Sequence, residues 1–420
     1  MLKKLWRVVR WWELLLAPWI VTVLTFFFVA PRVTDSATGL VVMALIAGAL
    51  STFAAAFHLF EASPSKLNKV IATELVVVGL IAAVGWALFF NRPPPNNETV
   101  GDRGIPFERV KLSTGLHVAV ARLPGDGQRP PVVFLHGGPG RPVSASDVTF
   151  FKSLAEKGID VVLFDQGGVG ESDTLPRSEV TVERAVAEVE ALREKLGLET
   201  ISIVGQSWGA RLAIEYAGTH RNRVAKIALA GGAPLSADPK LWKFDNRRTA
   251  LKKELSPLSF TPILAALILH GVNPKASESF ASKEELNGMV AANVPAIFKR
   301  SVCEKDGDKA TVGKVAGLDG TQFMLLRKPL ETRDAPKVDP PAPTLVFRPE
   351  CDFSQWLNAK DYRDRLKGQV VYLKGAGHAI WPLHAEPARD TLVAFFKDEP
   401  LPIPPYEADA DPAGELPPLP

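Results

Sequence analysis

The pentapeptide Gly205–Gly209, Gly-Gln-Ser-Trp-Gly, is the clearest candidate for chemistry in this sequence. An apolar run, residues 201–204, precedes it, and a segment with helical periodicity follows. A G-x-S-x-G motif between a buried strand and a helix is typical of a nucleophile elbow, a sharp turn that exposes the serine hydroxyl. Glycines suit such a turn because it leaves no room for Cβ atoms beside the serine. We therefore predict that Ser207 is a nucleophile.

A nucleophilic serine requires a base that removes its proton and a carboxylate that orients the base. In chains with this elbow the order along the sequence is serine, acid, histidine. Of seven histidines, only His378 and His384 lie late enough. His378 follows an apolar run and the residues Gly-Ala-Gly, so we expect it at the end of a strand and predict that it is the general base. His384 comes after a proline and is expected to be a surface or lid-facing side chain.

The acid is expected on the loop after the apolar run 344–347, in the stretch LVFRPECDFSQW. We predict Asp352, and Glu350 on the same loop remains the alternative. Between them lies Cys351, whose only possible partner in the chain is Cys303. A disulfide would join the loop to the preceding insertion, whereas two free buried thiols are the other possibility. We predict the disulfide.

Acyl transfer also needs backbone donors for the oxyanion. The stretch HGGPG at residues 136–140 provides one, because Gly138 allows its N–H to approach a substrate, and the N–H of Trp208 at the helix start provides another. His136 is expected to hold this loop by hydrogen bonds, with a role as a second base as the alternative. This chemistry requires no cofactor and no metal, and we predict neither.

The rest of the chain contains the elements that must position these residues. Short apolar runs that end in glycine alternate with helical patterns over residues 107–235 and 344–398, which predicts a doubly wound, mostly parallel α/β sheet. Residues 236–343 interrupt this rhythm and are expected to form a helical cap. Residues 93–106 are a Pro- and Asn-rich linker. The Pro-rich, acidic tail 399–420 is expected to be disordered.

Residues 1–92 are expected to form a membrane region. Three almost wholly apolar runs, at about 14–30, 38–60 and 70–90, each have the length of roughly 20 residues that crosses a bilayer. A cleavable signal peptide is the alternative for the first run, but two more runs follow it directly.

The basic residues before the first run set the expected orientation. They place the N-terminus in the cytoplasm by the positive-inside rule, and they are Lys3, Lys4, Arg7 and Arg10. Three spans then place everything after residue 90 outside, so we predict a multi-pass protein of a bacterial cell membrane. These residues also account for most of the net charge of +3, which gives no reason to expect a nucleic-acid partner.

Three motifs in order, HGGPG at 136–140, DQGGVGES at 165–172 and GQSWG at 205–209, resemble those of the prolyl iminopeptidase family of α/β-hydrolases. The likeness covers about residues 107–397. It implies hydrolysis of peptide or amide bonds, typically with release of an N-terminal residue. It also implies a triad of Ser207, Asp352 and His378 beneath a helical cap.

The sequence departs from the family pattern at two positions. Gly167 stands where the family usually has arginine, and Pro349 stands where the acid motif usually opens with glycine. The family's elements for binding a substrate amine have no clear counterpart here. Four acids of the expected cap are candidates to pair with such an amine, although most are expected to be solvated: Glu254, Glu278, Glu284 and Glu285.

Three functions are compatible with these patterns. The first is a membrane-anchored serine peptidase that acts on a peptide or small amide outside the cytoplasm. The second is a carboxylesterase or lipase-like enzyme, because the motifs define the acyl-enzyme chemistry better than the leaving group. The third is a non-catalytic membrane sensor or scaffold. The sequence does not determine the oligomeric state.

Overall fold

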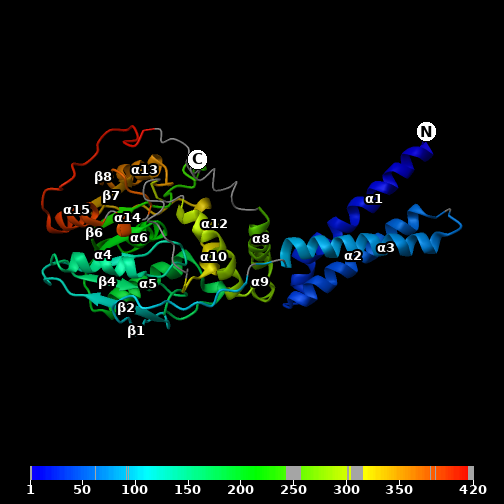
Figure 1. Ribbon diagram of the computed structural model, residues 1–420, viewed down its shortest axis with the longest axis horizontal. Helices are drawn as coiled ribbons and strands as arrows, with labels where there is room; N and C mark the ends of the chain where they lie inside the picture. Colours follow the sequence, from blue (N-terminus) through cyan, green and yellow to red (C-terminus); the bar gives the residue numbers. More distant parts are fainter. Residues whose placement is uncertain are drawn as a thin grey trace. The chain divides into compact units, whose positions relative to one another are not determined.

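A computed structural model of the chain describes residues 2–61, 63–90, 92, 94–242, 257–299, 302–303, 316–378, 380–383 and 385–414 (Figure 1). The chain forms two compact units. The helical unit comprises Met1–Pro94 and Ser256–Met289, and the sheet unit comprises Pro95–Leu255 and Val290–Pro420.

The sheet unit is built on an eight-stranded sheet of order β1-β2-β4-β3-β5-β6-β7-β8. The strands are β1 (Glu108–Lys111), β2 (His117–Leu123), β3 (Val132–Leu135), β4 (Val161–Phe164), β5 (Ile201–Gln206), β6 (Val224–Ala230), β7 (Thr344–Pro349) and β8 (Gln369–Leu373). Strands β1 and β2 form an antiparallel hairpin, β2 pairs antiparallel with β4, and all other pairs are parallel. The predicted, mostly parallel sheet is therefore confirmed.

Helices cover both faces of this sheet, which explains why β3 and β4 read as unbroken apolar runs, VVFL and VVLF, with every residue buried. On one face α4 (Ala145–Ala155) packs with α14 (Ile380–Leu383) and α15 (Ala385–Lys397). On the other, α5 (Val182–Lys195) packs with α6 (Trp208–Thr219), and α13 (Trp356–Leu366) contacts β7 and β8. Single 3₁₀ turns, η4 (Arg177–Glu179) and η5 (Arg221–Arg223), complete the connections.

The helical unit contains three stretches long and apolar enough to cross a membrane, Val9–Arg32, Ala37–Leu59 and Lys66–Phe90. They are formed by α1 (Leu2–Leu24) with η1 (Thr25–Val29) and η2 (Ala30–Arg32), by α2 (Ala37–Leu59), and by α3 (Lys66–Gly85) with η3 (Trp86–Phe90). A stripe on α2 at every fourth position is buried: Leu40, Ala44, Gly48, Thr52 and Ala56. Mostly small residues in such a stripe let the helices approach closely. Large apolar side chains face outward, as Leu50 does with 67 % exposure.

The interval expected to form one cap is divided between the two units. Helices α8 (Pro257–Val272) and α9 (Pro274–Phe280) and the start of α10 (Lys283–Lys299) belong to the helical unit. Helices α11 (Gly320–Leu325) and α12 (Arg327–Thr332) belong to the sheet unit. The physical reason is composition, because α8 is apolar along most of its length and packs against η1 and η3.

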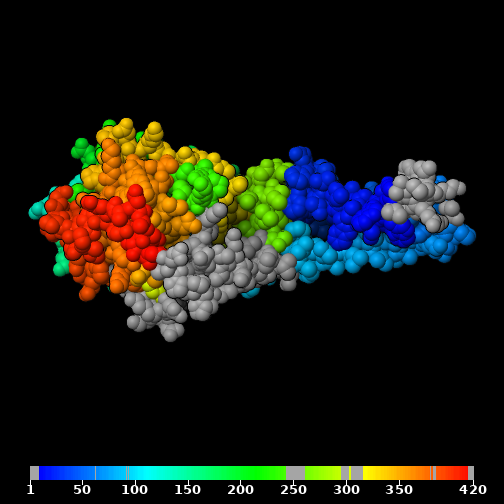
Figure 2. All heavy atoms as spheres, turned by 90° about the horizontal axis from the view of Figure 1, so that it is seen from above, coloured from blue at the N-terminus to red at the C-terminus, as the bar shows by residue number. Residues whose placement is uncertain are grey.

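The tail was expected to be disordered, and its described part, which ends at Gly414, makes contacts with the sheet unit. Asp411 pairs with the buried guanidinium of Arg348 at 2.8 Å, and the indole N–H of Trp356 donates to the carbonyl oxygen of Asp409 at 2.8 Å. Figure 2 shows this C-terminal segment, in red, lying against the orange residues that precede it. The acidic side chains that suggested a solvated tail instead balance basic residues of the sheet unit.

Candidate active site

Ser207 occupies the turn between β5 and α6 with φ 56° and ψ −114°, a conformation that L-residues rarely adopt. The flanking glycines explain how the turn is possible. A Cβ at Gly205 would lie 2.5 Å from the carbonyl oxygen of Gly209, and a Cβ at Gly209 would lie 1.9 Å from that of Leu135. The elbow predicted from the sequence is therefore present, and only glycine fits at these two positions.

His378 lies on the loop after β8, and its Nδ1 is 2.9 Å from Oδ1 of Asp352 on the loop after β7. An ionised carboxylate can only accept a hydrogen bond, so Nδ1 carries the proton and Nε2 is left with a lone pair. The ring of Phe353 stacks on the imidazole with centroids 4.1 Å apart, and the side-chain amide of Gln206 donates to the carbonyl oxygen of His378 at 3.0 Å. These contacts hold the imidazole at the edge of the sheet that also carries Ser207.

The carboxylate of Asp352 is 1 % exposed. Burial by itself would raise the pKa of Asp352. The nearby His378, the N–H of Ser354 at 2.8 Å and the guanidinium of Arg348 outweigh that effect, so the pKa is lowered. The group is therefore ionised at neutral pH and suited to stabilise a positively charged imidazole.

Glu350, the alternative acid, has a different partner. Its Oε2 accepts from the N–H of Gly375 at 2.5 Å, and the next residue, Cys351, donates its N–H to the carbonyl oxygen of Ala376 at 2.8 Å. Glu350 thus joins the acid loop to the turn before His378. The geometry favours Asp352 as the acid and gives Glu350 a positioning role that the sequence did not indicate.

The HGGPG loop lies beside the nucleophile, because a Cβ at Gly137 would be 3.1 Å from Cβ of Ser207. Gly138 has φ +124°, and a Cβ there would meet the backbone nitrogens of Gly140 and Arg141 at 2.7 and 2.8 Å. Trp208 begins α6, where the first N–H groups have no partner within the helix. Gly138 and Trp208, which the sequence predicts as oxyanion donors, thus lie on two segments that meet at Ser207.

His136 connects the three motifs of the sequence. Its Nε2 accepts from the N–H of Gln166 at 3.0 Å, and its Nδ1 lies 3.2 Å from the carbonyl oxygen of Gly137. The indole N–H of Trp208 donates to Oε1 of Gln166 at 2.9 Å. Complete burial lowers the pKa of His136 to about 3, so the ring is neutral and its acceptor is occupied. This is the structural role expected for His136, and Gln166 is a partner that the sequence reasoning missed.

The departure at Gly167 has a local cause. The N–H of Gly167 donates to Oε2 of the buried Glu188 at 2.9 Å, and a Cβ at position 167 would lie 2.6 Å from the other oxygen of that carboxylate. From α11, the amide of Gln322 donates to the carbonyl oxygen of Gly167, and the N–H of Asp319 donates to that of Gly140 at 2.8 Å. A side chain at position 167 would require the carboxylate of Glu188 to move, and α11 covers both glycine-rich loops.

Cys303 and Cys351 form a disulfide, with sulfurs 2.00 Å apart. It ties the acid loop to a segment just after α10. The carboxylate of Glu350 lies near both sulfurs, but sulfurs bonded to each other are not the thiolates that a metal ion requires.

Glu278, Glu284 and Glu285 belong to the helical unit, where Glu285 pairs with Arg92 at 3.2 Å. Glu254 and His384 lie outside the described residues.

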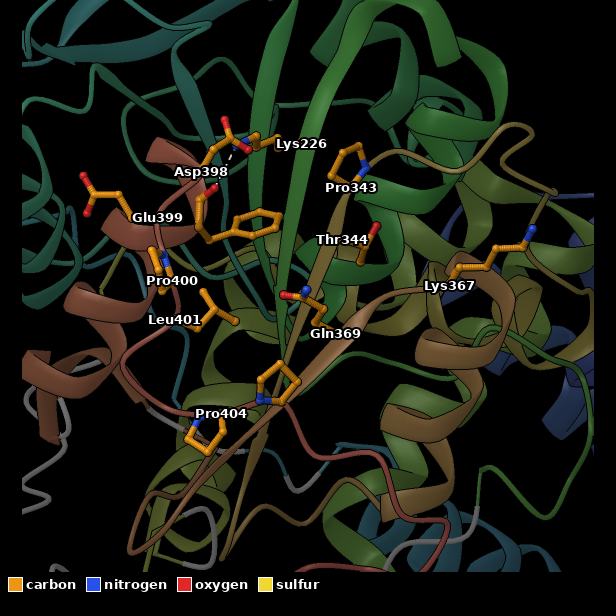
Figure 3. A pocket seen from close by; sticks show the side chains of 12 residues that line it. Lys226, Pro343, Thr344, Lys367, Gln369, Asp398, Glu399, Pro400, Leu401 and Pro404 are labelled. Carbon is orange, nitrogen blue, oxygen red and sulfur yellow. Dashed lines mark hydrogen bonds and ion pairs between the residues drawn. The ribbon is translucent and has the colours of Figure 1, made fainter.

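A cavity of about 590 Å³ lies at the amino ends of β6, β7 and β8, the opposite ends of these strands from the catalytic candidates (Figure 3). Lys226, Thr344 and Gln369 line it at the strand starts. The ammonium of Lys226 is already bound to Asp398 at 2.7 Å and to the carbonyl oxygen of Phe395 at 2.8 Å. This cavity is therefore separate from the site around Ser207.

Comparisons with known proteins agree with this geometry. Residues 130–260 match the family model described as alpha/beta hydrolase fold. The solved structure of VinJ matches with a TM-score of 0.51 and 22 % identity over 70 % of this chain and 98 % of VinJ, which shows the fold alone. The strand order and the elbow are those of this fold, and the sheet unit therefore has the α/β-hydrolase fold.

Curated relatives define the kind of α/β-hydrolase more closely. The chain is 34 % identical over 176 residues to the proline iminopeptidase of Heyndrickxia coagulans, which is 42 % of this chain and 57 % of the relative. It is 31 % identical over 191 residues to that of Lactiplantibacillus plantarum, 43 % of this chain and 63 % of the relative. The chain thus spans less than two thirds of the length of these relatives. Within that span it is similar to the proline iminopeptidases.

Proposed function

We propose that this protein is a membrane-anchored serine hydrolase that cleaves peptide or amide bonds through an acyl-enzyme intermediate, most simply as an aminopeptidase. The observation that carries the proposal is the 2.9 Å pair between His378 and Asp352 at the sheet edge where Ser207 occupies the strained elbow. The curated relatives named proline iminopeptidase support a substrate with an N-terminal residue to be released.

The geometry suggests how each residue acts. Nε2 of His378 takes the proton of Ser207 as its oxygen attacks the substrate carbonyl, and the N–H groups of Gly138 and Trp208 stabilise the resulting oxyanion. The imidazolium is stabilised by the ionised Asp352 and then gives its proton to the departing amine. Water, deprotonated by the same imidazole, releases the acyl group and restores the serine.

The membrane part of the proposal rests on the three apolar stretches and on the charges that flank them. The first stretch is preceded by basic residues, so we infer a cytoplasmic N-terminus and an extracytoplasmic hydrolase unit. A disulfide in the hydrolase unit supports the extracytoplasmic placement, because disulfides persist outside the cytoplasm.

The test is labelling of the full-length protein in detergent by a fluorophosphonate, followed by turnover of three substrates: prolyl-arylamide, its N-acylated form and a short aryl ester. We expect labelling and cleavage of the free arylamide, with both lost in Ser207→Ala. The matched control is Ser202→Ala, on the same strand and buried, which should keep both.

Each outcome separates one of the three functions. Ester turnover without arylamide cleavage would make the protein an esterase with the same triad. No labelling of the folded protein would favour a non-catalytic sensor or scaffold. Equal cleavage of free and N-acylated arylamides would support an amidase and exclude an aminopeptidase.

A further inference from the structure

Helix α8 is a part of the hydrolase insertion that packs in the helical unit. The insertion separates β6 from β7 in the sequence, yet residues Ser256–Met289 pack with the membrane-span helices. Figures 1 and 2 show α8 and α9, in green, against one end of the blue three-helix bundle. A segment of the enzyme's own fold therefore contributes to the membrane region.

Polar contacts fix the place where α9 meets this bundle. The side-chain amide of Asn273 donates to the carbonyl oxygen of Pro31 and to Oδ1 of Asp35, both at 2.7 Å. The N–H of Ala37 donates to Oγ of Ser279 at 2.8 Å. Both contacts lie at the connection between the first and second spans, outside the apolar stretches or at their limits.

The end of the third span is attached to the same segment. The ring of Phe280 packs against Phe26 and Phe90 with centroids 5.7 and 5.8 Å apart. Arg92 donates to the carbonyl oxygen of Phe280 at 2.7 Å and pairs with Glu285 at 3.2 Å. The ends of the first and third spans lie on the same side of a membrane. The insertion makes hydrogen bonds to residues at both ends.

The outward face of α8 is apolar. Leu264 is 56 % exposed, Leu267 and Ile268 are partly exposed, and these positions follow the i, i+3, i+4 spacing of one helix face. Ile263 and Leu269 on the other side are buried. The apolar part, Thr261–Val272, contains no Asp, Glu, Lys or Arg, its one ionisable residue is His270 near the end, and it is too short to cross a bilayer.

The span ends also expose apolar side chains. At the span ends to which α8 packs, Phe28, Val29 and Trp86 are 43, 51 and 66 % exposed. Water would make contact with all of these side chains in a soluble protein, whereas lipid would cover them in a membrane protein. The side chains of α9 differ, because Lys275 and Glu278 are exposed and charged.

We propose that α8 is a fourth membrane-embedded element, seated in the leaflet at the outer ends of the spans, with its Leu264 face in contact with lipid acyl chains and α9 at the headgroups. The proposal rests on the proposed membrane anchoring and deepens it. The chain of the hydrolase unit is then attached to the bilayer through the insertion as well as through the third span. Lipid therefore contacts a segment of the enzyme fold itself.

Depth-dependent fluorescence quenching tests the proposal. The native cysteines are joined to each other, so an introduced cysteine can be labelled selectively with an environment-sensitive dye. We place the dye in Leu264→Cys, in Leu50→Cys near the middle of α2, and in the matched control Lys275→Cys on α9. The full-length variants are reconstituted in phosphatidylcholine nanodiscs with lipids that carry a nitroxide high or low on the acyl chain.

We expect the shallow nitroxide to quench the dye at position 264 roughly threefold more than at position 275, as for a helix buried by 5 to 10 Å. The deep nitroxide should quench position 50 best. Equal quenching at 264 and 275 with strong quenching at 50 would overturn the α8 proposal and leave the anchoring intact. A blue-shifted but unquenched dye at 264 would mean that protein covers α8, which also overturns it. No quenching at 50 would overturn the anchoring, and the α8 proposal with it.

Discussion

Gly231 offers the sharpest test of the triad geometry. It follows β6 with φ +56°, and a Cβ at this position would lie 2.7 Å from Nδ1 of His378 and 2.8 Å from Oδ2 of Asp352. Ordinary contacts of a Cβ begin near 3.4 Å. In Gly231→Ala the imidazole or the carboxylate must therefore move by roughly 0.7 Å, because neither is the flexible end of a long side chain.

Such a displacement should reduce catalysis far more than stability. A misplacement of about 1 Å costs on the order of 10²-fold in rate, so we expect kcat/KM to fall roughly 30- to 100-fold, or about 2 to 3 kcal/mol of transition-state stabilisation. The left-handed backbone adds strain of about 1 to 2 kcal/mol to the folded state of any non-glycine residue.

A second glycine separates these two effects. Gly197 has φ +67°, and a Cβ at this position would have no other atom within 4 Å, so Gly197→Ala carries the strain alone. We would measure kcat/KM for the best arylamide or ester, fluorophosphonate labelling rate and thermal unfolding of both variants. The reasoning is refuted if Gly231→Ala keeps the kcat/KM of Gly197→Ala at a similar unfolding temperature.

Three further predictions follow from the same site. Asp352→Asn should lower kcat on the order of 10⁴-fold with little change in KM, because the amide no longer selects the Nδ1–H tautomer, and a loss below tenfold in steady-state kinetics would contradict the assignment. Cys303→Ser should destabilise the protein by about 4 kcal/mol in denaturant titrations, because the disulfide closes a separation of 48 residues; two alkylatable thiols in the unreduced native protein would exclude the bond. The folded protein holds His136 neutral with a pKa of about 3, against an ordinary value of 6.5. Its contribution to the free energy of unfolding is therefore complete above pH 6.5 and is lost as the pH falls toward 3, by about 1.4 kcal/mol per pH unit. His136→Gln should therefore show a shallower loss of stability between pH 6 and 4, and parallel curves would refute this.

Local patterns predicted a large part of this molecule. The elbow was predictable because a strand, two glycines around a serine and a helix are adjacent in the sequence, and each is required by sterics that act over a few residues. The parallel sheet was predictable because strands buried on both faces read as continuous apolar runs. The three apolar stretches were also predictable, since length and composition alone decide whether a helix can cross a bilayer.

Features that depend on distant residues were harder to predict. The acidic composition of the tail suggested disorder, but Asp411 finds a buried arginine that lies far from it in the sequence. The insertion was expected to be one cap, but α8 packs on the apolar N-terminal helices because its apolar surface has partners there. Neither partner is visible in a local window, so composition alone could not indicate these contacts.

The sequence by itself determined the class of fold and predicted Ser207 as nucleophile and His378 as base, because each follows from residue order and from constraints within a single strand, turn or helix. Only the tertiary structure distinguished Asp352 from Glu350, since two carboxylates on one loop differ in the side of the chain that each faces: one meets His378 and the other meets the N–H of Gly375. The structure also showed that Gly231 must lack a side chain, because the atoms that would collide with it come from two other loops. Contacts between loops are set by the packing of the whole sheet, which no local pattern encodes.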